Sequence, residues 1–278
     1  MDDTLWFEEE IFPSDESVQM VAGTVKGLDA GLLAEAMEAL GLGSLLETLA
    51  GMTKAQREAT VARRARETFR GIIRAHKPAA FALAAGTRGR GGDALPYARG
   101  AAYLVRLSVE FDLPEELKEA HYFYRKVYCR ATLTADGQEC LPTVLEVYPD
   151  RLIEGGPRLV KVEFKPALKW ATVEGSLGSA AGDVQVGVVA PATLGFLGAE
   201  QRAPYWEMTE QQQAILGRYN FWFVLDVPAG CEPAAVQLGL LGEGDLKFRL
   251  GPFPMGPRRR ERRPEQWLTL GEIIGRGK

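Results

Sequence analysis

The spacing of apolar residues changes character along the chain. Up to about residue 120, apolar positions recur at helical spacing, whereas beyond it they alternate with polar positions. A repeat near 3.6 residues is typical of a helix with one buried face, and a repeat of two is typical of a half-buried strand. We therefore expect a helical region followed by an all-β region.

The helical region is expected to form a small bundle. Thr53 and Gln56 have the spacing of a capping box, ahead of a long amphipathic helix predicted over 54–77. Pro78 then ends or kinks that helix. Shorter helices are predicted after Asp29, after a second capping box at Ser44 and Glu47, over 97–111 and over 115–120.

The β region is expected to be antiparallel, because its strands follow one another without intervening helices. Strands are predicted over 122–134, 139–148, 158–165, 183–190, 219–227, 236–240 and 246–250. The first two are expected to pair as a hairpin about the turn at 135–138. The strand over 219–227 is apolar on both faces, which predicts a central position in the sheet.

These elements predict an α+β chain in three parts. A small N-terminal helical bundle with an acidic first segment is expected over 1–120, and an antiparallel β-sandwich over 121–256. A β-barrel is the alternative for the second part. A basic C-terminal tail is expected over 257–278.

Composition adds a charge pattern to this outline. The chain has 278 residues, is 46% hydrophobic and 25% charged, and carries a net charge of −4. These values exclude a wholly disordered chain and a globally basic nucleic-acid binder. Residues 1–52 nevertheless hold 11 acidic residues and one basic residue, whereas 53–77 hold eight basic and two acidic residues. We expect the acidic segment to fold against the basic helix, and an oppositely charged ligand or subunit is the alternative.

The three cysteines are interpreted as small buried hydrophobic residues. Their number is odd, they are widely spaced and they form no C-x-x-C pair: they are Cys129, Cys140 and Cys231. A nucleophile or a redox switch is the alternative.

The acidic N-terminus is unlike a signal peptide, so we predict a cytoplasmic location. No apolar run approaches the roughly 20 residues of a spanning helix, so no constitutive transmembrane segment is expected.

Catalytic and cofactor motifs are missing from the sequence. The chain has two histidines and lacks a P-loop, an H-E-x-x-H motif and a G-x-S-x-G motif. Cys140 with His121 is the one conceivable pair of nucleophile and base. We therefore predict that the protein is not an enzyme and has no cofactor, no metal site and no catalytic residues.

Two kinds of surface are candidates for binding. One is aromatic and cationic, on one face of the first predicted strand and in the loop over 191–217: Tyr122, Tyr124, Lys126, Tyr128, Arg130, Tyr205 and Trp206. Cross-strand aromatic pairing, with the helical region as a cover, is the alternative for that face. The other kind is basic: Arg63, Arg64, Arg66, Arg70, Arg258, Arg259, Arg260, Arg262 and Arg263. After the last of these, the apolar stretch over 267–274 is expected to dock either on the protein's own sandwich or on a neighbouring subunit.

The leading functional hypothesis is a non-catalytic intracellular binding or assembly protein, acting through protein–protein or self-association surfaces. One alternative is a membrane-acting effector whose amphipathic N-terminal helices are released by a trigger. The other is a nucleic-acid-associated protein that uses its arginine clusters. The predicted partner is therefore a protein or a second copy, with nucleic acid or an anionic membrane as alternatives through the basic helix and tail.

Overall fold

The structure is a computed structural model. It describes residues 4–26, 30–39, 42–84, 86–87, 100–119, 122–152, 158–163, 183–189, 192–210, 215–233, 236–248, 251–257 and 267–274.

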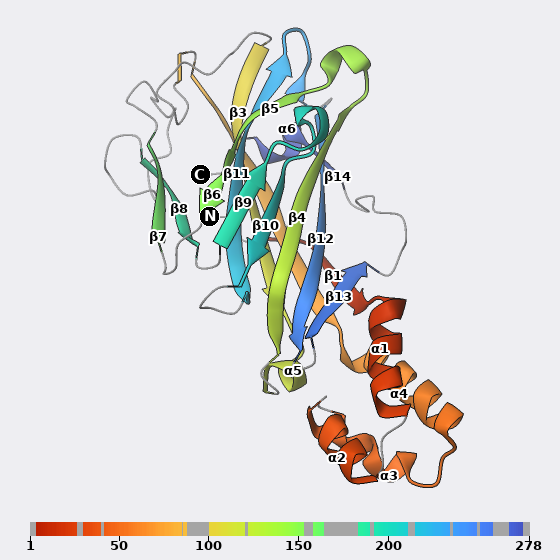
Figure 1. The fold of residues 1–278 in the computed structure, drawn as a ribbon. Helices are drawn as coiled ribbons and strands as arrows, with labels where there is room; N and C mark the ends of the chain where they lie inside the picture. Colours follow the sequence, from red (N-terminus) through yellow and green to blue (C-terminus); the bar gives the residue numbers. More distant parts are fainter. Residues whose placement is uncertain are drawn as a thin grey trace.

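One large antiparallel sheet dominates the described part of the chain (Figure 1). Its strands follow the order β5-β11-β3-β2-β1-β13-β12-β4-β10-β9-β6, and β14 pairs with β12. Their bounds are β1 Leu5–Pro13, β2 Gly71–Ala82, β3 Gly100–Asp112, β4 Phe123–Ala135, β5 Thr143–Tyr148, β6 Arg151–Leu152, β9 Ala192–Phe196, β10 Tyr205–Thr209, β11 Gly217–Pro228, β12 Val236–Phe248, β13 Gly251–Pro257 and β14 Trp267–Thr269. A separate pair joins β7 (Arg158–Glu163) to β8 (Asp183–Val189).

Helices α1 to α4 gather at one end of this sheet (Figure 1). Helix α1 (Asp15–Lys26) packs against α4 (Lys54–Thr68), and α2 (Ala30–Ala39) and α3 (Leu46–Leu49) lie beyond them (Figure 1). Helix α5 (Glu115–Glu119) joins β3 to β4, and α6 (Leu270–Ile273) follows β14. Single helical turns occur at Gly43–Leu45, Gln138–Cys140 (η2) and Ala199–Gln201. Buried side chains of the helices, including Met37, Leu49 and Val61, belong to the same core as those of the sheet.

The predicted fold class is wrong. The N-terminal helical bundle is absent from the described residues, because β1, β2 and β3 from that region lie within the large sheet, between β11 and β13. A single large sheet replaces the predicted sandwich. The alternative of a closed barrel is also wrong, since the sheet is open and its end strands β5 and β6 are not ladder partners.

Two predicted helices are strands for part or all of their length. The helix over 54–77 ends at Thr68, and Gly71 begins β2. Of the segment predicted as a helix over 97–111, the part from Gly100 onward belongs to β3, and 97–99 lie outside the described residues. Side chains of both strands lie in the core, among them Ile73 of β2 and Val105 and Leu107 of β3, and their burial outweighs helical propensity. The capping box at Thr53 is confirmed: Gln56 N–H donates to Thr53 Oγ1, and Thr53 N–H donates to Gln56 Oε1. The capping box predicted at Ser44 and Glu47 is wrong. The N-cap residues of the two helical turns there are Leu42 and Leu45, and neither makes a side-chain hydrogen bond to the turn.

The pairing of the β region also differs from expectation. Strand β4 lies between β12 and β10, whereas β5 pairs with β11 at the other end of the sheet, so the hairpin of 122–148 is wrong. The loop predicted over 191–217 contains β9 and β10. Strand β11 is buried on both faces and is an interior strand, as predicted, but it lies between β3 and the end strand β5 and not in the middle of the sheet.

The C-terminal apolar stretch docks on the protein itself, which is one of the two predicted alternatives. Strand β14 pairs with β12, and Leu270 and Ile273 of α6 are buried. Ile274 forms a bridge with Ala80 of β2. Among the helices described, none is both long enough and apolar enough to cross a bilayer.

Candidate functional site: an aromatic surface and an ion-pair cluster

A β-bulge in β4 decides which of its aromatic side chains face the core. Lys126 pairs with Asp245 of β12, and the next pair joins Tyr124 to Leu246, so Arg125 is left over. Because side chains alternate along a strand, one extra residue moves every side chain before it to the opposite face. Tyr122 and Tyr124 therefore share the buried face with Val127.

Three predicted surface residues are consequently part of the core. Tyr124 and Trp206 are fully buried and Tyr122 is 6% exposed. The Tyr124 hydroxyl donates to the backbone oxygen of Asp112 at 3.0 Å, and burial raises the pKa of Tyr124 well above its usual value. The Trp206 ring stacks on Phe221 with the ring centroids 4.9 Å apart. The prediction that these three residues form a binding surface is therefore wrong, because a ligand at the surface does not reach buried side chains.

The other four lie together on the outer face of β4 and β10. Phe196, Tyr205 and Arg130 are partners in one row across β9, β10 and β4. The Phe196 and Tyr205 rings stack 4.6 Å apart, and the Arg130 guanidinium lies 5.7 Å from the centre of the Tyr205 ring. In the next row, Tyr128 pairs with Glu207. We call Lys126, Tyr128, Arg130, Phe196, Tyr205 and Glu207 the aromatic surface.

The two cations of the aromatic surface differ in their electrostatic environment. The Lys126 ammonium forms an ion pair of 2.6 Å with Glu207 and lies 4.8 Å from the centre of the Tyr128 ring. Partial burial disfavours its charge, but hydrogen bonds to Glu207 and Tyr128 outweigh this and raise the pKa of Lys126. Arg130 is exposed, and no carboxylate of the described residues forms an ion pair with it. Its charge is therefore available to an acidic group from outside.

The basic residues of the α4 region mostly pair within the chain. Arg66 contacts Asp15 at 2.8 Å, Arg70 contacts Glu10 at 2.9 Å, and Arg64 contacts Glu67 at 3.1 Å. The acidic N-terminal segment thus lies against the basic segment, as predicted. Arg63 is exposed. Of the predicted basic patches, Arg258, Arg259, Arg260, Arg262 and Arg263 lie outside the described residues.

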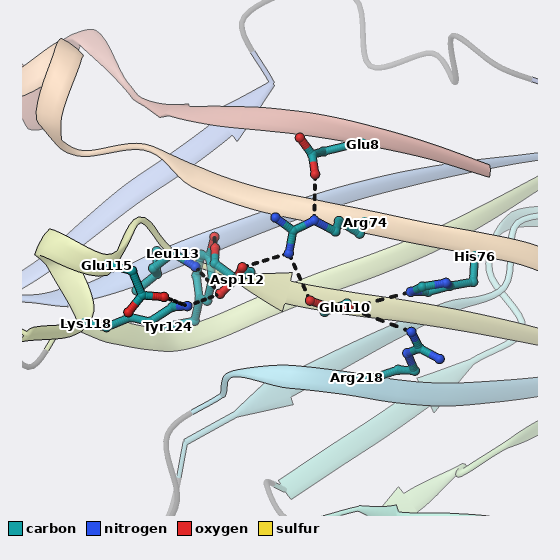
Figure 2. Close-up of polar contacts among 10 residues, drawn as sticks. All are labelled: Glu8, Arg74, His76, Glu110, Asp112, Leu113, Glu115, Lys118, Tyr124 and Arg218. Carbon is teal, nitrogen blue, oxygen red and sulfur yellow. Dashed lines mark hydrogen bonds and ion pairs between the residues drawn. The ribbon is translucent and has the colours of Figure 1, made fainter. Parts of the chain in front are cut away.

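A cluster of ion pairs centred on Arg74 crosses the outer face of four strands (Figure 2). Glu8 of β1, Arg74 of β2, Glu110 of β3 and Arg218 of β11 are successive ladder partners in one row. Arg74 contacts Glu8 at 2.6 Å, Glu110 at 2.9 Å and Asp112 at 2.7 Å. Its hydrogen bonds to Asp112 and Glu8 raise the pKa of Arg74 further.

Asp112 connects this cluster to α5. Its carboxylate contacts Lys118 at 2.7 Å and accepts a hydrogen bond from the Leu113 N–H at 2.9 Å (Figure 2). Partial burial disfavours the charged form, but the bonds from Lys118, Arg74 and Leu113 outweigh it and lower the pKa of Asp112. The same pair raises the pKa of Lys118.

The chemistry of the cluster fits a structural role better than a catalytic one. A general acid at neutral pH needs a carboxyl whose pKa is raised, whereas the pKa of Asp112 is lowered. His76 is 8% exposed and lies 3.6 Å from Glu110, at the rim of the same network. In the described ranges, no group of three or more histidine, cysteine or acidic side chains is arranged to hold a metal ion.

A comparison with known protein families found none that matches the chain, and no curated protein sequence matches it.

One sequence pattern points to the ion-pair cluster around Arg74, although we predicted a helix for the segment that contains it. Over 105–112, apolar and polar residues alternate without exception, and Arg106, Ser108, Glu110 and Asp112 are the polar positions. This pattern indicates a strand with one polar face. It does not indicate that β2 supplies Arg74 to that face, because strand neighbours are set by long-range pairing.

Proposed function

We propose that the protein is a non-catalytic binding protein and that a protein partner contacts its aromatic surface. The observation that carries this proposal is the row of Phe196, Tyr205 and Arg130. Phe196 is 38% exposed, although it is large and apolar. Aromatic side chains and arginine are enriched among the residues that dominate binding energy at protein interfaces.

The charge of this surface indicates the partner's chemistry. Lys126 is neutralised by Glu207, so Arg130 supplies the uncompensated charge beside the stacked rings. A partner that places a carboxylate over Arg130 and apolar side chains over Phe196 and Tyr205 would satisfy both parts of the surface. We therefore propose an acidic protein segment as the partner.

Site-specific crosslinking tests this proposal. A photoreactive benzoylphenylalanine replaces Phe196 in one variant and Leu32 in the control, since Leu32 is 51% exposed on α2 and far from the aromatic surface (Figure 1). After irradiation in the native cell extract, we expect a product of defined mass from position 196 and none from position 32. Adding Arg130→Glu to the first variant is expected to weaken that product about tenfold or more.

Equal products from both positions, or no product from position 196, would contradict the proposal. A product that contains only two copies of this chain would replace the acidic partner with self-association. A product that Arg130→Glu leaves unchanged would remove the proposed role of charge.

A further inference from the structure

The two ends of the large sheet approach each other along a seam that has no strand ladder. At one end lies β5, and near the other lies β9. The Gly195 N–H of β9 donates to the Asp150 oxygen, just beyond β5, at 2.9 Å. A Cβ on Gly195 would overlap the Pro149 oxygen and lie 3.0 Å from Val147 Cγ2 and from Trp206 Nε1. Close backbone contact therefore brings β5 over the core beside Trp206.

Strand β5 is held to the sheet mainly by its ladder with β11. That ladder contains five residue pairs, from Trp222 with Tyr148 to Asp226 with Thr143, and a register shift interrupts it. An edge strand with one ladder depends on few backbone bonds, so it is among the elements that separate first from a sheet.

A disulfide fastens the outer end of this ladder. Cys140 ends η2, three residues before β5, and Cys231 lies three residues after β11. The two sulfur atoms are bonded, although 91 positions separate the residues along the sequence. Both cysteines are partly exposed, so solution reagents reach the bond. The interpretation of Cys140 and Cys231 as buried free thiols is therefore wrong, because the folded chain brings distant turns together.

We propose that the Cys140–Cys231 disulfide is a redox-sensitive crosslink that holds β5 on β11, and we call it the clasp. When the bond is closed, it holds β5 on β11 and against β9. When it is reduced, β5 separates more readily and exposes the core beside Trp206. The third cysteine does not compete for pairing, because Cys129 is 1% exposed and burial raises the pKa of its thiol.

The clasp closes by thiol–disulfide exchange with a small disulfide such as oxidised glutathione. One cysteine thiolate attacks the glutathione disulfide, forms a mixed disulfide and releases a first glutathione thiolate. The second cysteine thiolate then attacks the protein sulfur of the mixed disulfide and releases a second glutathione. Two protein thiols are oxidised, one glutathione disulfide is reduced, and the released glutathione thiolates take up the two protons.

The stability of this disulfide depends on the cellular compartment in which the protein is located. Stable disulfides form in oxidising compartments and are rare where glutathione and thioredoxin keep thiols reduced. The predicted cytoplasmic location stays a prediction. In that compartment the clasp would be open at rest and would close under oxidation.

Two measurements on the purified full chain test the clasp. The first counts thiols that react with N-ethylmaleimide in denaturant, after incubation with oxidised glutathione. We expect one reactive thiol, at Cys129, and three after reduction with a phosphine. The second measures amide hydrogen exchange at β5, with β2 as the internal control. Reduction is expected to accelerate exchange at β5 about tenfold or more and to leave β2 unchanged.

A matched pair of variants separates the clasp from a general thiol effect. The double variant Cys140→Ser and Cys231→Ser is expected to lower the Tm by roughly 5 to 15 °C and to abolish the effect of reductant on β5. Cys129→Ala removes the buried thiol and is expected to keep the response of β5 to reductant. Three reactive thiols after oxidation, or exchange at β5 that reduction leaves unchanged, would overturn the proposal. The experiment on the intact chain decides the matter even where the double variant fails to fold.

Discussion

Gly71→Ala is expected to lower the free energy of unfolding by about 2 to 4 kcal/mol. A Cβ at Gly71 would overlap the Tyr124 hydroxyl and would lie 2.7 Å from Ile11 Cγ1. Neither neighbour moves cheaply, because Tyr124 and Ile11 are fully buried and the hydroxyl donates to the Asp112 backbone. The bulge at Arg125 is what brings Tyr124 into this space. Urea unfolding of the purified variant, followed by circular dichroism, measures the loss.

Gly23→Ala provides the control with the opposite sign. Gly23 is exposed in α1, and a Cβ there would meet nothing within 4 Å. Because alanine is the better helix former, this variant is expected to gain about 0.5 to 1 kcal/mol. Equal, small effects at both glycines would show that Tyr124 does not occupy the space beside Gly71, and the position of the bulge would then be wrong.

Arg74→Met is expected to lower the free energy of unfolding by about 2 to 3 kcal/mol at pH 7. The substitution keeps much of the apolar length of the side chain but removes the cation that Glu8, Glu110 and Asp112 share. The side chains of Glu110 and Asp112 are 25% and 21% exposed, so these two carboxylates are only partly solvated when the cation is removed. The matched control is Arg64→Met, where a single exposed ion pair with Glu67 is lost and the change is expected to stay below about 0.5 kcal/mol.

The effect of Arg74→Met is also expected to depend on pH. The pKa of Asp112 in the folded protein lies below its usual value of 3.8, so the ionised carboxylate stabilises the fold above about pH 4. That contribution is lost as the pH falls below 4 and Asp112 takes up a proton. The difference between Arg74→Met and the unaltered protein should therefore shrink from pH 7 to pH 3 in urea unfolding. A difference that stays constant over this range would argue against the ion pairs as its source.

Local signals predicted the elements best where they agreed with long-range packing. The capping box at Thr53 and the doubly apolar segment of β11 were both identified from sequence. The strands β2 and β3 were not, because alanine and leucine in those segments favour helices. Long-range pairing with β1 and β11 places both strands in the sheet, where side chains such as Ile73, Val105 and Leu107 are buried in the core, and that burial outweighs propensity.

The candidate site could be predicted only in part, for a reason that lies in β4. Alternation correctly grouped Lys126, Tyr128 and Arg130 on the outer face. It placed Tyr124 with them because the bulge at Arg125 depends on the register with β12, which no local pattern in β4 encodes. The disulfide shows the same limit, since its two cysteines, 91 positions apart, lie together because β5 pairs with β11.

The bulge at Arg125 divides the tyrosines of β4 into a buried pair, Tyr122 and Tyr124, and an outward-facing Tyr128. Nitration of tyrosine by tetranitromethane in the native protein, followed by peptide mass spectrometry, tests this division. We predict that Tyr128 and Tyr205, which are partly exposed, are nitrated while Tyr122 and Tyr124 remain protected. Nitration of Tyr124 at the same rate as Tyr128 would contradict the claim.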